Sequence, residues 1–288
     1  MNINPFVNEM NGQKLNVEGI IVFQRGAVLA QYRWTPELPR TIYSVSKSFA
    51  AVAAGMAMDE GKLRLSDRVT QTLTRQRPDP RWDSLTLEHL LTMTMGHAKF
   101  TRPGSLEEAL DYELAHEPGT CFVYDNTCTF LVSALLTKVT GQTLRDYLLE
   151  RLFRPLGIPD PEWAQSGDGY TMGASGLTLT TSQMALFGRF LLQRGNWEGR
   201  QLVSAQWIDG ATRTQVPTCR AYSKPDNDMG YGYQFWTCRH GAYRCDGRDG
   251  QYIIVFPALD AVVTINAKEE NQQPILWAVW DHILPQLR

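Results

Sequence analysis

The stretch Tyr43-Ser44-Val45-Ser46-Lys47-Ser48-Phe49 begins an Ala-rich segment and contains the one place in the chain where a serine stands three residues before a lysine. On a helix these two side chains share a face, with Cβ atoms about 5–6 Å apart. A hydroxyl that close to an amine can act as a nucleophile with its base, and a helix N-terminus favours an oxyanion. The pattern points to Ser44 and Lys47 as catalytic residues; the alternative is a capping serine and a solvated lysine.

The segments around this helix indicate the fold. The helix is expected to run from Ser44 to about Glu60, where Gly61 ends it. Strand patterns occur near both ends of the chain, and helical patterns occupy most of the middle. The expected strands are residues 19–23, 27–32, 236–238, 242–244, 251–256 and 261–266.

Two terminal groups of strands that pair in one sheet leave the middle of the chain as an inserted lobe. We therefore predict an α/β (α+β) fold, with an antiparallel β-sheet flanked by helices and an inserted all-helical lobe. The sheet domain is predicted to comprise residues 1–68 and 168–288, and the helical domain residues 69–167. We expect the active site in the cleft between them, where pockets usually form.

Composition narrows the class of protein. The 288 residues carry 28 Lys and Arg against 30 Asp and Glu, a formal net charge of −2, so no basic surplus favours nucleic acid or an anionic membrane. No apolar run approaches the roughly 18–20 residues of a membrane span. The polar N-terminus is unlike a secretory signal, so we expect a cytoplasmic protein unless a leader has been lost. Five cysteines without a C-x-x-C pair predict neither a disulfide framework nor a zinc site.

A second chemical motif is Val123-Tyr124-Asp125-Asn126. Residues two apart on an extended segment point the same way, so Tyr124 and Asn126 share one side. A phenol beside an ammonium loses its proton more easily, so Tyr124 can serve as a general base. Asn126 offers a carbonyl and two donors to Lys47 or to a substrate amide or ester. The alternative is a packed tyrosine followed by a helix-capping asparagine.

A third motif is Cys245-Asp246-Gly247-Arg248-Asp249-Gly250-Gln251, which lies between two predicted strands. Glycines at this spacing let the backbone approach a ligand closely. The strand edge here is a candidate for the second oxyanion donor, the N–H of Arg248, opposite that of Ser44. The alternative is a glycine-rich hairpin turn.

Taken in order, these motifs resemble the serine β-lactamase-related family of class C β-lactamases, DD-peptidases and esterases. The resemblance runs from about residue 19 to 265. It rests on segments that are similar to the family's nucleophile helix, its T-x-x-x-L-L-x-H-x-S-G stretch, its Tyr motif and two later glycine-containing stretches. These segments are residues 43–49, 85–96, 118–126 with 140–141 and 155–157, 173–177, and 191–195.

The resemblance implies a β-lactamase/transpeptidase-like fold and a serine hydrolase that forms an acyl-enzyme. It implies Ser44 as the acylated nucleophile, Lys47 and Tyr124 as the proton-handling pair, and Asn126 as a positioning residue. No metal or organic cofactor is required by this chemistry. The expected partner is a small ester, amide or peptide-like substrate, and the sequence leaves the oligomeric state open.

The third motif departs from the family. Lactamases and peptidases have Lys-Thr-Gly there, and many relatives His-x-Gly, whereas this chain has Cys245-Asp246-Gly247. The cation that would hold a substrate carboxylate is absent from the triplet, and Asp246 would repel one. Strand alternation argues against both Arg244 and Arg248 pointing into the cleft to compensate.

Three functions follow from this comparison. The missing cation favours an esterase or amidase, with Asp246, Gly247 and Arg248 lining the substrate site. A β-lactamase or D-amino-acid peptidase is the first alternative, and a non-catalytic ligand-binding relative the second. Other chemistry-bearing side chains, including His89, His97 and Trp236, are interpreted as packing or capping residues.

Overall fold

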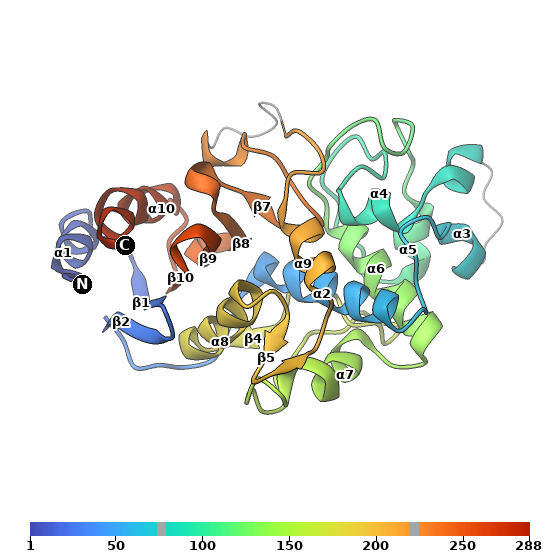
Figure 1. The fold of residues 1–288 in the computed structure, drawn as a ribbon. Helices are drawn as coiled ribbons and strands as arrows, with labels where there is room; N and C mark the ends of the chain where they lie inside the picture. Colours follow the sequence, from blue (N-terminus) through green and yellow to red (C-terminus); the bar gives the residue numbers. More distant parts are fainter. Residues whose placement is uncertain (74–78, 219–224) are drawn as a thin grey trace.

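A six-stranded antiparallel sheet with the order β2-β1-β10-β9-β8-β7 forms one part of the molecule, and the helices α3 to α7 lie beside it (Figure 1). This computed structural model describes residues 1–73, 79–218 and 225–288. Two small sheets, β3-β4 and β5-β6, complete the strands. The strands are β1 (Val17–Gln24), β2 (Ala27–Arg33), β3 (Arg40–Thr41), β4 (Thr178–Leu179), β5 (Asn196–Trp197), β6 (Arg200–Gln201), β7 (Trp236–Thr237), β8 (Tyr243–Gly247), β9 (Gln251–Phe256) and β10 (Ala261–Ala267).

The sheet joins the two ends of the chain, as the sequence predicts. β1 and β2 form the expected hairpin, with Arg25 and Gly26 in the left-handed region at its turn. β1 also pairs with β10, where Ile20 lies opposite Ile265. The prediction that both terminal strand groups share one sheet is therefore confirmed, while the domain boundaries near residues 68 and 168 stay a prediction.

Helices cover both faces of this sheet. The helices are α1 (Asn4–Gly12), α2 (Ser46–Asp59), α3 (Val69–Thr72), α4 (Leu87–Leu91), α5 (Leu106–Asp111), α6 (Asn126–Thr140), α7 (Leu144–Leu148), α8 (Thr181–Leu192), α9 (Ala205–Thr212) and α10 (Gln273–Ala278). α1 and α10 pack on the face that carries Tyr252 and Ile254. α2 and α8 belong to the core on the opposite face, with Ile253 and Val255. Alternation along β9 thus divides the interior into two apolar layers.

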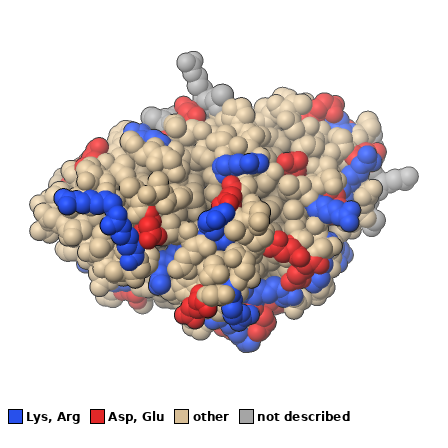
Figure 2. Space-filling view, viewed as in Figure 1, with Lys and Arg blue, Asp and Glu red and all other residues tan. Residues whose placement is uncertain are grey.

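Helix hydropathy and the surface charges bear on the class of partner. In the described ranges, no helix is long and apolar enough to cross a membrane. On the face drawn in Figure 2, basic and acidic side chains are interspersed among uncharged ones.

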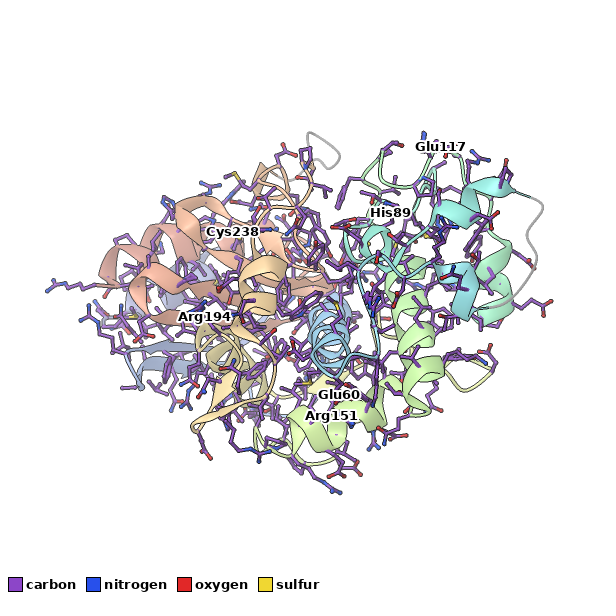
Figure 3. All side chains as sticks on the ribbon, turned by 45° about the vertical axis from the view of Figure 1, so that its right-hand side comes forward. Glu60, His89, Glu117, Arg151, Arg194 and Cys238 are labelled. Carbon is purple, nitrogen blue, oxygen red and sulfur yellow. The ribbon has the colours of Figure 1, made fainter. Side chains whose placement is uncertain are left out.

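α2 is the buried helix around which the rest is arranged. Its residues from Ser46 to Ala57 are all buried, because α6, α7, α9 and β8 pack around it. Its end is tied to the helical region, since Arg151 Nε donates to Glu60 Oε1 at 2.7 Å (Figure 3). Gly61, at a φ of 71°, follows and ends the helix as predicted. α2 therefore carries its N-terminal end at a fixed position between sheet and helices.

We expect Gly55→Ala to destabilise the protein. A Cβ at Gly55 would lie 2.2 Å from Cδ1 of Trp207, and this indole cannot move freely because it stacks on Tyr233 and donates to Ala51 O. Overpacking of this kind costs roughly 1–3 kcal/mol, against about 1 kcal/mol of helix propensity gained. Chemical denaturation should show a lower free energy of unfolding.

Gly210→Ala is the matched control, because nothing lies within 4 Å of the added Cβ in α9. It should leave stability unchanged or raise it by up to about 1 kcal/mol. Equal effects of the two substitutions would contradict the close packing of α2 on α9.

Candidate active site

Ser44 lies just before α2, in a 3₁₀ turn (Tyr43–Val45) that runs directly into the helix. The α-helix begins at Ser46, two residues later than predicted, and Val45 is its N-cap with no side-chain cap. The interpretation of Ser44 as a helix cap is therefore wrong. Tyr43 has a φ of 46°, which non-glycine residues seldom adopt. Backbone strain of this kind gathers at functional sites.

The Lys47 amine has three oxygen atoms around it. Its Nζ lies 3.1 Å from Ser44 Oγ, and it donates to Asn126 Oδ1 at 2.6 Å and to the Ala174 carbonyl at 2.9 Å. A neutral amine has two hydrogens and one lone pair. When the hydrogens go to Asn126 and Ala174, the lone pair is directed at the Ser44 hydroxyl, in the position of a base.

Burial sets the protonation of this amine. Lys47 is 1% exposed, and loss of hydration lowers the pKa of Lys47 to about 7. The Asp125 and Cys128 groups oppose this lowering, and the Arg102 charge adds to it. About half of the lysine is therefore neutral near pH 7, which a general base requires.

The lowered pKa makes the stability of the protein depend on pH through Lys47. The lysine titrates near 7 in the folded chain and near 10.5 when unfolded. Between these values the unfolded chain binds more protons, so wild-type stability rises with pH. Lys47→Met removes this dependence, and we expect its stability relative to wild type to fall by on the order of 3 kcal/mol from pH 7 to pH 10.

The measurement is urea denaturation at several pH values, with the exposed Lys138→Met as the control. The control should follow wild type at every pH. A constant difference between Lys47→Met and wild type would show that the folded lysine titrates normally.

The Tyr motif reaches Lys47 from the start of α6. Val123 N donates to the Met93 carbonyl at 2.9 Å, and Asp125 N to Met93 Sδ at 3.4 Å, so this extended segment is held by one residue. Asp125, not Asn126, is the N-cap of α6, with its carboxylate accepting from Thr127 N. The capping interpretation of Asn126 is wrong, and its amide is free to bind Lys47.

The Tyr124 ring borders the amine. Its centroid lies 5.0 Å from Lys47 Nζ. Trp236 stacks on the ring at 5.4 Å with an interplanar angle of 28°, and Tyr231 meets it edge-on at 6.0 Å. Two segments far apart in sequence thus bring a hydroxyl, an amine and a phenol ring together. The sequence interpretation of Trp236 as a core residue missed its stacking on Tyr124.

Gly247 of the third motif packs directly against the nucleophile turn. A Cβ on Gly247 would lie 2.5 Å from the Ile42 carbonyl and 3.2 Å from Val45 Cγ2. A glycine is required here because β8 passes directly against the Ile42 backbone and the Val45 side chain, which flank Ser44. Arg248 follows on the surface as the first residue of a 3₁₀ turn. The N–H of Arg248 as an oxyanion donor stays a prediction.

Asp246 lies on the opposite face of the sheet. It pairs with Tyr252, which faces α1 and α10. Its carboxylate accepts from Arg244 Nε at 2.8 Å and from Gln272 Nε2 at 3.3 Å. The same alternation turns Cys245 and Gly247 toward α2. The structure therefore does not bring Asp246 together with Ser44, and the buried Arg244 is occupied on the same far side.

Two contacts of the site have only weak signals in the sequence. The Ala174 carbonyl belongs to the stretch 173–177, whose resemblance to the family marked it without a role. Met93, at a φ of 60°, holds the Tyr motif through its carbonyl and its sulfur. A backbone oxygen or a thioether that acts through loop geometry leaves no periodic pattern to find.

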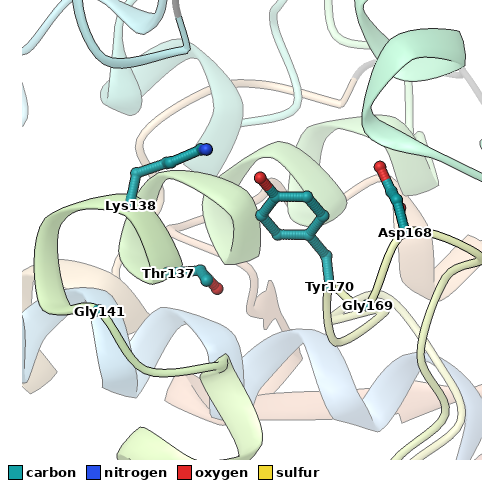
Figure 4. A pocket seen from close by; sticks show the side chains of 6 residues that line it. All are labelled: Thr137, Lys138, Gly141, Asp168, Gly169 and Tyr170. Carbon is teal, nitrogen blue, oxygen red and sulfur yellow. The ribbon is translucent and has the colours of Figure 1, made fainter.

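Other parts of the described chain do not form a comparable site. No group of three or more His, Cys, Asp or Glu in it is placed to hold a metal ion. A surface hollow of about 450 Å³, lined by Thr137, Lys138 and Tyr170 among others, lies beside the end of α6 (Figure 4). Thr137 is eleven residues along the helix from Asn126, a rise of about 16 Å. This hollow is separate from Lys47.

Comparison with known proteins agrees with this geometry. The family described as Beta-lactamase matches residues 11–278. The chain belongs to the beta-lactamase family. This confirms the family resemblance found in the sequence.

Curated relatives of this beta-lactamase family member share part of their length with it. The Beta-lactamase of Escherichia coli (strain K12) is 31% identical over 147 residues, which are 45% of this chain and 38% of that protein. The Beta-lactamase of Pseudomonas fluorescens is 29% identical over 143 residues, 45% of this chain and 40% of that protein. The matched part is less than half the length of either relative.

Solved structures share the fold along nearly the whole chain. A beta-lactamase from Mycobacterium bovis superposes with a TM-score of 0.76 at 22% identity, covering 98% of this chain and 99% of that one. An octameric penicillin-binding protein homologue from Pyrococcus abyssi gives 0.79 at 20% identity, covering 99% and 77%. The predicted mixed fold, an antiparallel sheet with helices in the β-lactamase/transpeptidase-like arrangement, is confirmed.

Proposed function

We propose that this protein is an esterase or amidase that works through an acyl-enzyme on Ser44. The observation that carries the proposal is the position of Lys47 Nζ, 3.1 Å from Ser44 Oγ and bound to two other oxygen atoms. Because a pKa of about 7 leaves much of this amine neutral, it can accept the serine proton at neutral pH.

The reaction proceeds in two halves. Ser44 Oγ bonds to the substrate carbonyl carbon while its proton passes to Lys47 Nζ, which becomes an ammonium. The tetrahedral oxyanion collapses, the bond to the leaving alcohol or amine breaks, and the Lys47–Tyr124 pair returns a proton to the leaving group. Water then attacks the acyl carbon while its proton passes to Lys47, the bond from the acyl carbon to Ser44 Oγ breaks, Oγ takes the proton back, and the acyl group leaves as the carboxylic acid. The N–H groups of Ser44 and Arg248 are the candidate oxyanion donors.

The substrate preference follows from the third motif. Cys245 stands where lactamases and peptidases of the family have a lysine, and it is buried against Ser48. Arg244, its cationic neighbour, is bound to Asp246 and Asn227 on the far side of β8. A fixed cation for a substrate carboxylate is thus missing from this triplet. We expect neutral esters and amides to be preferred over substrates that carry a carboxylate.

β-Lactam hydrolysis is the second candidate. The observation that favours it is the 31% identity with the Beta-lactamase of Escherichia coli. Most β-lactams carry a carboxylate next to the reacting ring, so the same missing cation opposes rapid turnover of them. A ligand-binding protein without turnover is the third candidate.

The test compares three substrates with one enzyme preparation. p-Nitrophenyl valerate and mono-p-nitrophenyl glutarate have similar acyl chains but differ in a terminal carboxylate, and a chromogenic cephalosporin reports β-lactam hydrolysis. We expect kcat/KM to be highest for the valerate. A higher value for the cephalosporin would favour the β-lactamase, and no turnover of any substrate by a folded protein would favour the binding protein.

A further inference from the structure

A buried histidine and a buried aspartate form a pair directly behind the Tyr motif. His97 Nδ1 lies 2.5 Å from Asp125 Oδ2, and the side chains are 2% and 0% exposed. Asp125 stands between Tyr124 and Asn126, the two residues that border the Lys47 amine. His97 comes from the loop after α4, so the pair joins two separate segments.

The Asp125 carboxylate is fully provided with donors. Thr101 donates to it through its backbone N at 2.7 Å and through its hydroxyl at 2.7 Å, and Thr127 N donates at 3.3 Å. His97 adds a fourth contact through Nδ1. A buried carboxylate with this many donors is held in one position. The residue that carries it cannot shift without breaking several bonds.

The carboxylate also acts on the proposed base. The Asp125 charge works to raise the pKa of Lys47 against the effect of burial. Cys128 acts in the same direction, and Arg102 in the opposite one. On the other side of the histidine, the Tyr112 ring meets His97 edge-on at 5.6 Å, and its hydroxyl donates to Glu108. Among these groups, Asp125 is the residue bonded covalently to both Tyr124 and Asn126.

We propose that the His97–Asp125 pair is a positioning element of the active site, in which His97 Nδ1–H holds Asp125 so that Tyr124 and Asn126 stay placed around Lys47. The inference rests on the proposed function and adds two positioning residues to it. Neither residue touches the reacting atoms. Their effect passes through the fixed Asp125 backbone and through one buried negative charge near the amine.

Only one nitrogen of the His97 imidazole, Nδ1, contacts the Asp125 carboxylate. His97 Nε2 is buried and has no hydrogen-bonding partner in the described part of the chain. The ring borders a small hollow of about 240 Å³, which Lys99, Tyr112 and Glu113 also line. A histidine kept for packing alone would need neither nitrogen. The positioning role therefore belongs to Nδ1, which contacts Asp125, and not to Nε2.

This asymmetry gives a matched pair of variants. The amide of asparagine reaches the place of Nδ1, and the amide of glutamine reaches the place of Nε2. We expect His97→Asn to keep kcat for p-nitrophenyl valerate within about threefold of wild type. His97→Gln should lower kcat by about tenfold to a hundredfold, since loss of positioning acts mainly on kcat. The exposed His116→Gln is the control and should match wild type. Equal kcat for the Asn and Gln variants would overturn the proposal.

A second variant tests the charge. Asp125→Asn keeps the cap of α6 and the shape of the side chain but removes the negative charge. The midpoint of the kcat/KM profile on the acid side should move to lower pH by roughly half a unit to one unit. An unmoved midpoint would overturn the electrostatic part of the proposal.

A measurement on the wild-type protein covers the case in which a variant does not fold. In nitrogen-15 NMR of histidine-labelled protein, His97 should show a protonated Nδ1 in slow exchange; the Nε2–H tautomer would overturn the proposal. Labelling by a fluorophosphonate distinguishes a failure of the proposed function from a failure of the positioning role. An unlabelled Ser44 in wild type refutes the proposed function. Labelling of His97→Gln as fast as wild type, with Ser44 labelled in both, refutes the positioning role alone.

Discussion

Ser44→Ala is expected to lower kcat/KM for p-nitrophenyl esters by at least about a thousandfold. The substitution removes the oxygen atom that would bond to the substrate. Lys47 cannot take its place as the nucleophile, because hydrogen bonds to Asn126 and Ala174 hold its amine. Initial rates with p-nitrophenyl valerate measure the effect, and circular dichroism shows whether the fold is kept.

Ser46→Ala serves as its matched control. Ser46 is buried two residues further along the chain. Its hydroxyl accepts a long hydrogen bond of 3.4 Å from Leu177 N. We expect this variant to stay within a few-fold of wild type. A Ser44→Ala protein with wild-type rates would refute the assignment of the nucleophile.

The second large effect concerns the protonation of Lys47. The amine must be neutral to accept the Ser44 proton, and burial places its pKa at about 7. Activity is therefore lost as the pH falls through 7 and reaches a plateau above it. We expect kcat/KM to rise tenfold per pH unit on the acid side, with a midpoint near pH 7.

Lys47→Arg tests the same point without removing the positive charge. Arginine remains protonated at every accessible pH, so kcat should fall by about a hundredfold or more and no longer recover as the pH rises. Lys138→Arg, at the far end of α6, is the control and should behave as wild type. A flat wild-type profile between pH 5.5 and 8.5 would argue that Lys47 is not the base.

Much of the fold was accessible from local sequence patterns. The hairpin of β1 and β2 and the strands β9 and β10 have strong strand patterns bounded by turns, and pairing across the sheet follows from them. The start of α2 was less accessible. The turn at Tyr43–Val45 has helical spacing but forms a 3₁₀ segment, which begins at Tyr43 with a φ of 46°.

The central residues of the site were also predictable, because Ser44, Lys47 and Asn126 belong to short motifs with fixed spacing. The structure places Lys47 within hydrogen-bonding distance of both others. The face of β8 was not predictable in the same way. A strand that slips by one residue exchanges its two faces, and the sequence does not state that Gly247 rather than Asp246 meets the nucleophile turn.

The contacts that hold the Tyr motif in place could not be predicted from the sequence, for a different reason. His97 and Asp125 are 28 residues apart, and neither stands at a spacing that marks a pair. Trp236 belongs to a two-residue strand, too short for alternation to show that it stacks on Tyr124. Such contacts depend on the path that each loop takes back to the core, and this path cannot be predicted from the local pattern of a single sequence.

The most direct test of the account is intact-mass analysis after reaction with a fluorophosphonate, followed by peptide mapping. The account predicts one added phosphonyl group per chain, located on Ser44, and no addition in Ser44→Ala. It also predicts that the labelling rate rises with pH around a midpoint near 7, as Lys47 loses its proton. A folded protein that stays unlabelled, or that carries the label on another residue, would contradict it.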